Sequence, residues 1–86
     1  MRRHEVKVPK HVMKQIQDIS LPWRDRITRT INLLESDPFI GKKMRGKYEG
    51  RWKLRVWPYR IYYSVIKQEK RVIILNVRHR GSAGYK

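Results

Sequence analysis

The residues that could do chemistry are concentrated in the second half of the chain. Residues 51–60 read Arg-Trp-Lys-Leu-Arg-Val-Trp-Pro-Tyr-Arg, so cations alternate with large apolar side chains. Successive side chains of a strand point to opposite faces, which predicts one face lined by Arg51, Lys53 and Arg55. Arg60 begins the next predicted strand and, in a hairpin, reaches the same face. Such a cluster suits a phosphate backbone, although alternating charge is also ordinary on a solvated sheet face.

A second group of candidates follows the last predicted strand. Arg78, His79 and Arg80 stand where strand ends and loops often carry function, although such residues also simply cap an apolar strand. Tyr85 is the penultimate residue. It could stack on an exposed base of single-stranded RNA or be an ordinary surface residue, and the sequence leaves both interpretations open.

Several kinds of site are absent from the sequence. There are no cysteines and only 3 histidines, which are widely separated and have no carboxylate at a metal-ligand spacing, so no metal site is expected. The carboxylates form no catalytic pair, and no glycine-rich phosphate loop follows a strand. Any chemistry must therefore depend on Lys, Arg and Tyr, without a cofactor.

The composition points to a polyanionic partner. The chain has 86 residues, enough for a single domain over residues 1–86, and a formal net charge of +15. Self-repulsion of that size favours a partner such as RNA, DNA, the ribosome or an acidic protein. The N-terminus lacks the apolar stretch of a signal peptide, and no apolar run is long enough to cross a membrane. We therefore expect a cytoplasmic protein.

The first half of the chain has helical periodicity. Residues 3–8 alternate like a short strand, and Pro9 suits a helix start. Apolar residues recur at helical spacing in residues 10–19 and again in residues 22–35. Ser20-Leu21-Pro22 separates the two segments, and Pro38 follows the second. This pattern predicts a strand followed by a helical hairpin.

The second half of the chain has the period of strands. The predicted strands cover residues 44–48, 51–56, 60–67 and 71–78, and the last is the most apolar and so expected at the centre of the sheet. Helices followed by strands indicate an α+β fold. We expect an N-terminal strand and a two-helix hairpin packed on an antiparallel β-sheet of about four strands.

These residues together resemble a known signature. The run Trp-Lys-Leu-Arg-Val-Trp-Pro-Tyr-Arg-Ile-Tyr-Tyr of residues 52–63 is similar to the core of the RelE/ParE toxin superfamily, in which an aromatic-basic-apolar-Arg strand precedes a Tyr-Arg strand. Met44-Arg45-Gly46 looks like the Leu-x-Gly before that strand, and Arg78-His79-Arg80 followed by Tyr85 looks like the closing His-Arg…Tyr. The likeness covers nearly the whole chain and implies a RelE-like fold.

The resemblance implies a toxin of a type II toxin–antitoxin system. RelE-like members cleave mRNA in the ribosomal A site with cationic residues and no metal. Lys53 matches a lysine that helps to activate the 2′-hydroxyl, Arg60 an arginine that holds the scissile phosphate, and Arg80 one that acts on the leaving group. Tyr85 matches a tyrosine that stacks on the mRNA base. Arg51 replaces a second lysine, and Arg55 and Arg78 extend the RNA-binding surface.

The resemblance also implies partners and alternatives. The expected partners are mRNA, the ribosome and an acidic RelB-like antitoxin that binds the basic surface in a hetero-oligomer, with no membrane. ParE-like members of the superfamily instead inhibit DNA gyrase, and a gyrase inhibitor has no need of Lys53, Arg60, Arg80 and Tyr85 as a set. A non-catalytic RNA-binding domain is a third possibility.

Overall fold

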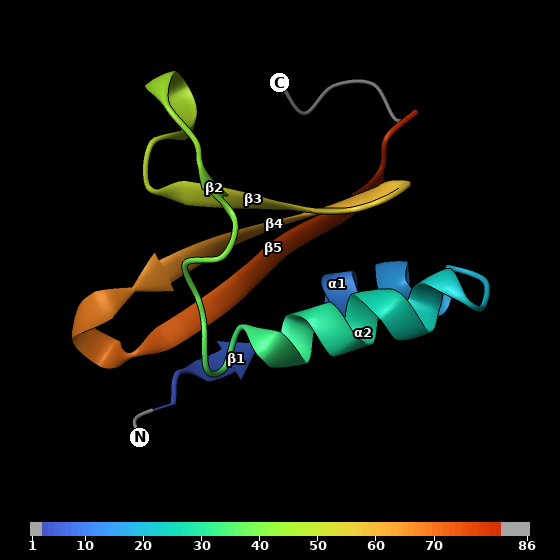
Figure 1. Ribbon diagram of the computed structural model, residues 1–86, viewed down its shortest axis with the longest axis horizontal. Coiled ribbons are helices and arrows are strands. Elements are labelled where there is room, and N and C mark those ends of the chain that lie inside the picture. The colour runs from blue at the N-terminus through green and yellow to red at the C-terminus, as the bar shows by residue number, and fades with distance from the viewer. Residues whose placement is uncertain (1–2, 82–86) are drawn as a thin grey trace.

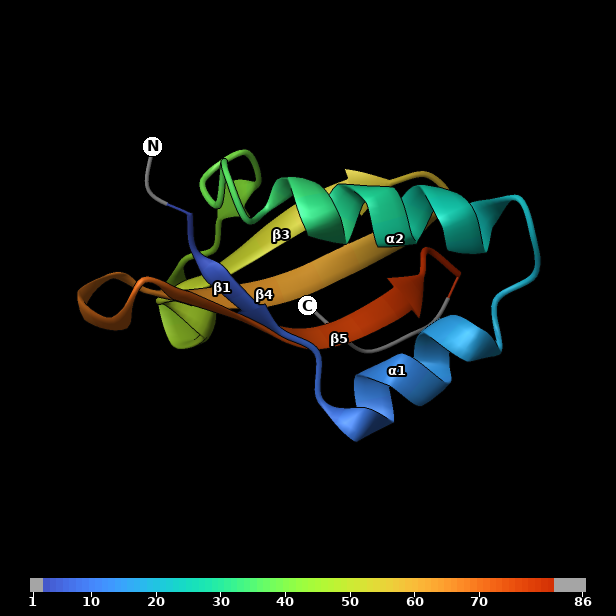
Figure 2. The ribbon, with the colours of Figure 1, turned by 90° about the horizontal axis from the view of Figure 1, so that it is seen from below.

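A five-stranded sheet carries both helices on one of its faces (Figures 1 and 2). The computed structural model describes residues 3–81, so Tyr85 lies outside the described residues. The elements, in chain order, are β1 (Glu5–Lys7), α1 (Lys10–Gln17), α2 (Trp23–Leu33), β2 (Lys42–Lys43), β3 (Arg51–Val56), β4 (Tyr59–Ile66) and β5 (Arg71–His79). Short 3₁₀ turns occupy Gly46–Tyr48 and Lys67–Glu69.

The predicted α+β architecture is confirmed. The strand order is β1-β5-β4-β3-β2, in which β2 to β5 are antiparallel neighbours and β1 joins β5 in parallel. The central strand is β4 and not β5, so the prediction from apolar content was wrong. The strand β5 lies between β1 and β4, one place away from the centre of the five strands.

The predicted strand over residues 44–48 was also wrong. Gly46 has a φ of 70° and starts the 3₁₀ turn Gly46–Tyr48, a conformation that breaks an extended chain. The edge strand is instead the two-residue β2, which pairs Lys42 with Lys53 and Lys43 with Trp52. A very short, lysine-bearing edge strand is one way in which sheets avoid pairing with other chains.

The hydrophobic core lies between the sheet and the two helices. The helical residues at the centre of this core follow the spacing that the sequence indicated, and five strand residues meet them from the inner sheet face. The core members are Val12, Ile19, Ile27, Ile31, Leu34, Ile61, Tyr63, Val72, Ile74 and Val77, each at most 7% exposed. Among residues 3–81, no helix is long and apolar enough to span a membrane.

A bulge in β5 changes the phase of the strand. Val72 and Ile74 face the core, but the next core residue is Val77, an odd step further on. The pairing shows why, because Tyr63 lies opposite Ile74 whereas the preceding residue, Tyr62, lies opposite Asn76. A strand alternates faces at every residue, so without the bulge residue 78 would share the core face with Ile74. After the bulge, the odd-numbered residues of β5 face the core instead of the even-numbered ones.

Helix α1 supplies hydrogen-bond partners to this bulge. β1 ends opposite Ile73, so the following part of β5 has no neighbouring strand on that side. Gln15 Oε1 accepts the backbone N–H of Val77 at 3.0 Å, and Gln15 Nε2 donates to Asn76 Oδ1 at 3.4 Å. His11 Nε2 lies 3.1 Å from the carbonyl oxygen of Leu75. His11 and Gln15 are four residues apart on one face of α1, where they replace a strand partner.

Replacing Gln15 by leucine is expected to destabilise the fold. The Val77 N–H would lose its acceptor, which costs about 1–3 kcal/mol when a buried donor is left unpaired. Urea unfolding measures the loss, and amide hydrogen exchange should show faster exchange at Val77. Gln17→Leu is the matched control, because Gln17 is exposed on the same helix and should change stability by less than about 0.5 kcal/mol. Equal effects at both positions would contradict the role of Gln15.

Candidate nucleic-acid interface

Three arginines form a row across the outer face of the sheet. The register places Arg60 of β4 directly opposite both Arg55 of β3 and Arg78 of β5. Directly opposite residues of antiparallel strands have Cβ atoms about 5 Å apart. Their chain neighbours Ile61 and Val77 are in the core, so the arginines point away from the helices. The register thus brings Arg60 to the face of Arg55, as the sequence predicted.

Lys53 lies two residues before Arg55 in β3, on the same face of the sheet as this row. It pairs with Tyr62 of β4 and with Lys42 of β2. Partial burial lowers the pKa of the Lys53 ammonium, and the positive charges of Arg60, Arg55 and Lys42 lower it further. The depressed pKa makes a neutral amine, which can accept a proton, more accessible at Lys53 than at an ordinary lysine.

Arg51 lies at the far end of the same strand. It pairs with Ser64, and its guanidinium carbon is 5.6 Å from the centroid of the Tyr48 ring. At about 3.3 Å per residue, the backbone of Arg51 lies about 13 Å from that of Arg55 along β3. Arg51 therefore extends the cationic face but does not join the arginine row.

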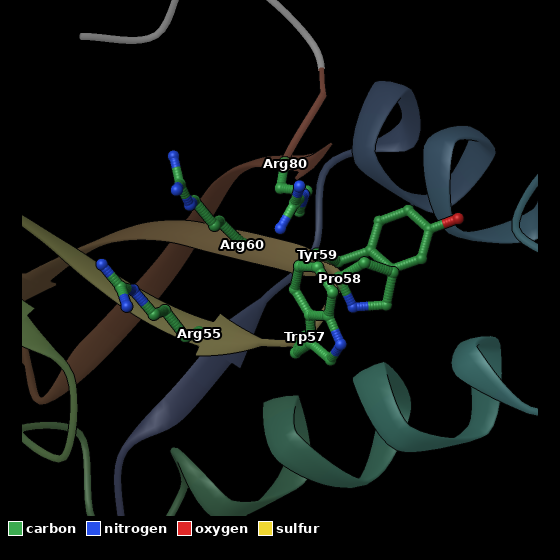
Figure 3. A pocket seen from close by; sticks show the side chains of 6 residues that line it. All are labelled: Arg55, Trp57, Pro58, Tyr59, Arg60 and Arg80. Carbon is green, nitrogen blue, oxygen red and sulfur yellow. The ribbon is translucent and has the colours of Figure 1, made fainter.

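A pocket opens where the arginine row meets the turn between β3 and β4 (Figure 3). Its volume is ≈ 210 Å³, and its lining residues are Arg55, Trp57, Pro58, Tyr59, Arg60 and Arg80. The backbone N–H of Arg80 donates to the Pro58 carbonyl at 2.7 Å, and its guanidinium carbon is 4.4 Å from the Trp57 ring centroid. These two contacts hold Arg80 beside Arg55 and Arg60, although Arg80 follows the end of β5.

His79, the chain neighbour of Arg80, is held by two contacts of its own. Its ring packs edge-on against Tyr59, with centroids 5.2 Å apart, and its Nδ1 accepts the backbone N–H of Gly81 at 3.0 Å. The structure therefore gives His79 a local structural role at the end of β5, whereas its neighbour Arg80 lines the pocket.

The cations at the pocket have no carboxylate partner among residues 3–81. Arg71, away from the pocket, does have such partners, since it contacts Glu5 at 3.2 Å and Glu69 at 3.0 Å. Arg55, Arg60 and Arg80 therefore concentrate positive charge that an anionic ligand would neutralise. Residues 3–81 also contain no group of His, Cys, Asp and Glu that could hold a metal ion.

Two residues near the site were not predicted from the sequence. Trp57 is 63% exposed and lines the pocket. Gly41 donates its N–H to the Tyr63 hydroxyl at 3.1 Å, and burial raises the pKa of that phenol. A Cβ at position 41 would lie 2.6 Å from the same hydroxyl and 2.8 Å from the Lys53 carbonyl oxygen. These contacts are long-range, so no local sequence signal identifies them.

Comparison with known proteins identifies the family. The family model described as the ParE toxin of the type II toxin–antitoxin system, parDE, matches residues 6–84. The chain belongs to this toxin family. The comparison with curated proteins found no match.

Solved toxin structures share the fold. A chain of the RelBE2 toxin–antitoxin complex from Mycobacterium tuberculosis superposes with a TM-score of 0.83 at 21% identity, covering 91% of this chain and 99% of the other. The isolated Escherichia coli RelE toxin gives 0.79 at 18% identity, with coverages of 93% and 87%. The archaeal RelE–RelB complex from Pyrococcus horikoshii gives 0.75 at 28% identity, with coverages of 93% and 98%. These similarities confirm the RelE-like fold, and the family model confirms the predicted RelE/ParE superfamily.

The crowding of Lys53 should be measurable by titration. Because the folded pKa is depressed, the unfolded chain binds more protons between the two pKa values, so stability rises with pH through that interval. Lys42→Gln removes one of the charges that disfavour the ammonium and should raise the pKa of Lys53. NMR titration of the lysine side-chain resonances measures the shift. Lys14→Gln, on α1, is the control, and equal Lys53 midpoints in both variants would disprove the coupling.

Gly41→Ala should disturb the strand that carries Lys53. The added methyl group meets backbone atoms of Lys53, which cannot move away as a flexible side chain can. Overpacking of this kind typically costs about 1–3 kcal/mol. Calorimetry measures the stability, and backbone amide shifts of β3 report the displacement. Gly46→Ala separates backbone strain from crowding, because Gly46 has a positive φ and open space around its Cβ position. Unchanged β3 shifts in Gly41→Ala would contradict the prediction.

Proposed function

We propose that this toxin is a ribosome-dependent endoribonuclease that cleaves mRNA in the ribosomal A site and so inhibits translation. The observation that carries the proposal is Lys53 with a lowered pKa next to the row formed by Arg55, Arg60 and Arg78. Charge alone would suit a binding protein. A lowered pKa makes a lysine better suited to act as a general base than an ordinary lysine.

The proposed reaction needs no metal. Neutral Lys53 takes the proton of the RNA 2′-hydroxyl, and the resulting oxygen attacks the adjacent phosphorus. The bond from phosphorus to the 5′-oxygen breaks, which leaves a 2′,3′-cyclic phosphate and a 5′-hydroxyl. Arg60 holds the phosphate and stabilises its developing charge, and Arg80 stabilises or protonates the leaving oxygen, which takes its proton from water where Arg80 only stabilises it. Arginine is effectively always charged, so the electrostatic role suits it better than proton transfer.

The remaining assignments concern binding. Arg51, Arg55 and Arg78 would contact phosphates along the RNA, and Tyr85 would stack on a base. Much of the alignment of the 2′-oxygen with the phosphate would come from the ribosome, because positioning contributes strongly to such reactions. We infer that the chain acts in the cytoplasm, where ribosomes and mRNA are found.

An antitoxin is the proposed protein partner. The similar structures from Mycobacterium tuberculosis and Pyrococcus horikoshii are complexes of a toxin with an antitoxin, and the matched family belongs to toxin–antitoxin systems. The net charge of +15 suits an acidic, RelB-like antitoxin that covers the cationic sheet face in a hetero-oligomer.

Gyrase inhibition is the second candidate function. It is favoured by the ParE name of the matched family model. A gyrase inhibitor acts by binding, so it requires the cationic surface but not the proton transfer assigned to Lys53. Substitution of Lys53 therefore distinguishes the two functions.

Lys53→Ala and Arg80→Ala should each abolish most of the activity. Loss of a general base or of transition-state charge stabilisation typically lowers rates about 10²- to 10⁴-fold. The purified chain is added to cell-free translation, and primer extension locates cuts in the mRNA with and without ribosomes. Cuts within codons that require ribosomes are the expected result, and Lys14→Ala on α1 should cut like the parent.

Two outcomes would contradict the nuclease. Intact mRNA together with inhibited supercoiling by DNA gyrase would establish the second candidate function. Undiminished cleavage by Lys53→Ala would remove Lys53 from the mechanism.

A further inference from the structure

We propose that Trp57 is a nucleobase-binding platform, on which a base of single-stranded RNA stacks while an adjacent phosphate contacts Arg55 and Arg60. The proposal rests on the proposed function for the choice of RNA as the ligand. It adds a binding residue that differs from Tyr85 and that lies within the described pocket.

The exposure of Trp57 is not explained by folding. At 63%, it is the most exposed of the large hydrophobic side chains in residues 3–81, whereas Trp23 and Trp52 pack against the core. Trp57 and Pro58 form the two-residue connection between Val56 and Tyr59. The exposed indole therefore does not contribute to the core.

Arg80 holds the indole beside the cations. Its guanidinium carbon lies 4.4 Å from the ring centroid, and its backbone N–H is fixed by the Pro58 carbonyl at 2.7 Å. Figure 3 shows Trp57 beneath Arg80 at the end of the β3–β4 hairpin, with Arg55 and Arg60 further along the strands. The pocket of ≈ 210 Å³ joins these groups. The guanidinium lies over one face of the indole and helps to fix the ring, which leaves the other face for a stacked base.

The exposed indole and the arginines of the pocket together fit a nucleotide better than an acidic peptide. A peptide carboxylate would use the arginines but would leave the flat indole without a matching group. A nucleotide joins a planar base to a phosphate, so it can occupy the indole and the guanidinium groups at once. Stacking on aromatic residues is largely independent of the base, because every base has a π face.

Tryptophan fluorescence tests the proposal directly. The purified chain is titrated with a short 2′-O-methyl RNA, which lacks the nucleophilic hydroxyl and cannot be cleaved, and with an abasic oligonucleotide of the same length and charge. Saturable quenching by the base-containing oligonucleotide is expected, and it should disappear in Trp57→Phe, which retains only Trp23 and Trp52. Because this assay contains no ribosome, its result is separate from that of the cleavage assay.

Affinity and salt dependence separate base contacts from phosphate contacts. Trp57→Ala should weaken binding of the base-containing oligonucleotide about 5- to 140-fold, which is 1–3 kcal/mol of stacking at 1.4 kcal/mol per tenfold. It should leave the abasic oligonucleotide and the salt slope unchanged, and Trp57→Phe should retain most of the affinity. Arg55→Ala should instead reduce the slope of log K against log salt by about 0.7.

Three results would overturn the proposal. Equal affinity of the parent for base-containing and abasic oligonucleotides would show that only phosphates are bound. Loss of abasic binding in Trp57→Ala would show that Trp57 acts only by holding Arg80. Indole fluorescence that responds to a protein partner but not to RNA would assign Trp57 to a protein interface. Circular dichroism of each variant verifies that the fold is retained.

Discussion

The bulge in β5 is the constraint on which both the core and the cationic face depend. Two requirements meet in this strand, because Val72, Ile74 and Val77 must be buried while Arg78 must reach the outer face. Strict alternation cannot satisfy both, since Ile74 and residue 78 are an even number of positions apart. The bulge satisfies both, and Gln15 of α1 bonds the backbone N–H of Val77 beside it. A helix on one side of the sheet thereby fixes the phase of charged residues on the other.

The parts of the fold that could be predicted from the sequence are those governed by local periodicity. The two helices and the alternation of residues 51–56 follow from apolar spacing, and the position of Arg60 opposite Arg55 follows from a hairpin with a short turn. The failures have non-local or conformational causes. The bulge has no signal within β5, because Gln15, which accepts the Val77 N–H, is 62 residues earlier in the chain. Residues 44–48 were predicted as a strand because the sequence does not show that Gly46 has a positive φ.

In the candidate site, too, local features could be predicted from the sequence and long-range contacts could not. Its cations and their types could be predicted, since Lys53, Arg55 and Arg60 lie within ten residues of one another and share one hairpin. The pocket could not, because it depends on Arg80 returning from the end of β5 to the Pro58 carbonyl and the Trp57 ring. Residue types thus indicate which chemistry is available, whereas long-range pairing determines which groups act together.

Electrostatic repulsion connects the fold to its function. Like charges placed directly opposite one another destabilise a sheet, yet Arg55, Arg60 and Arg78 occupy such positions on strands that the core holds in place. The burial of Ile61, Tyr63 and Val77 on the inner face offsets that cost. An anion relieves the repulsion whether it is a phosphate or a carboxylate, so the arginine row by itself favours RNA and an acidic antitoxin equally. Lys53 differs from the arginines of the row, because burial and the same repulsion that attracts an anion both disfavour its ammonium form. In the proposed nuclease, the neutral form of Lys53 is the one that would accept the proton of the 2′-hydroxyl.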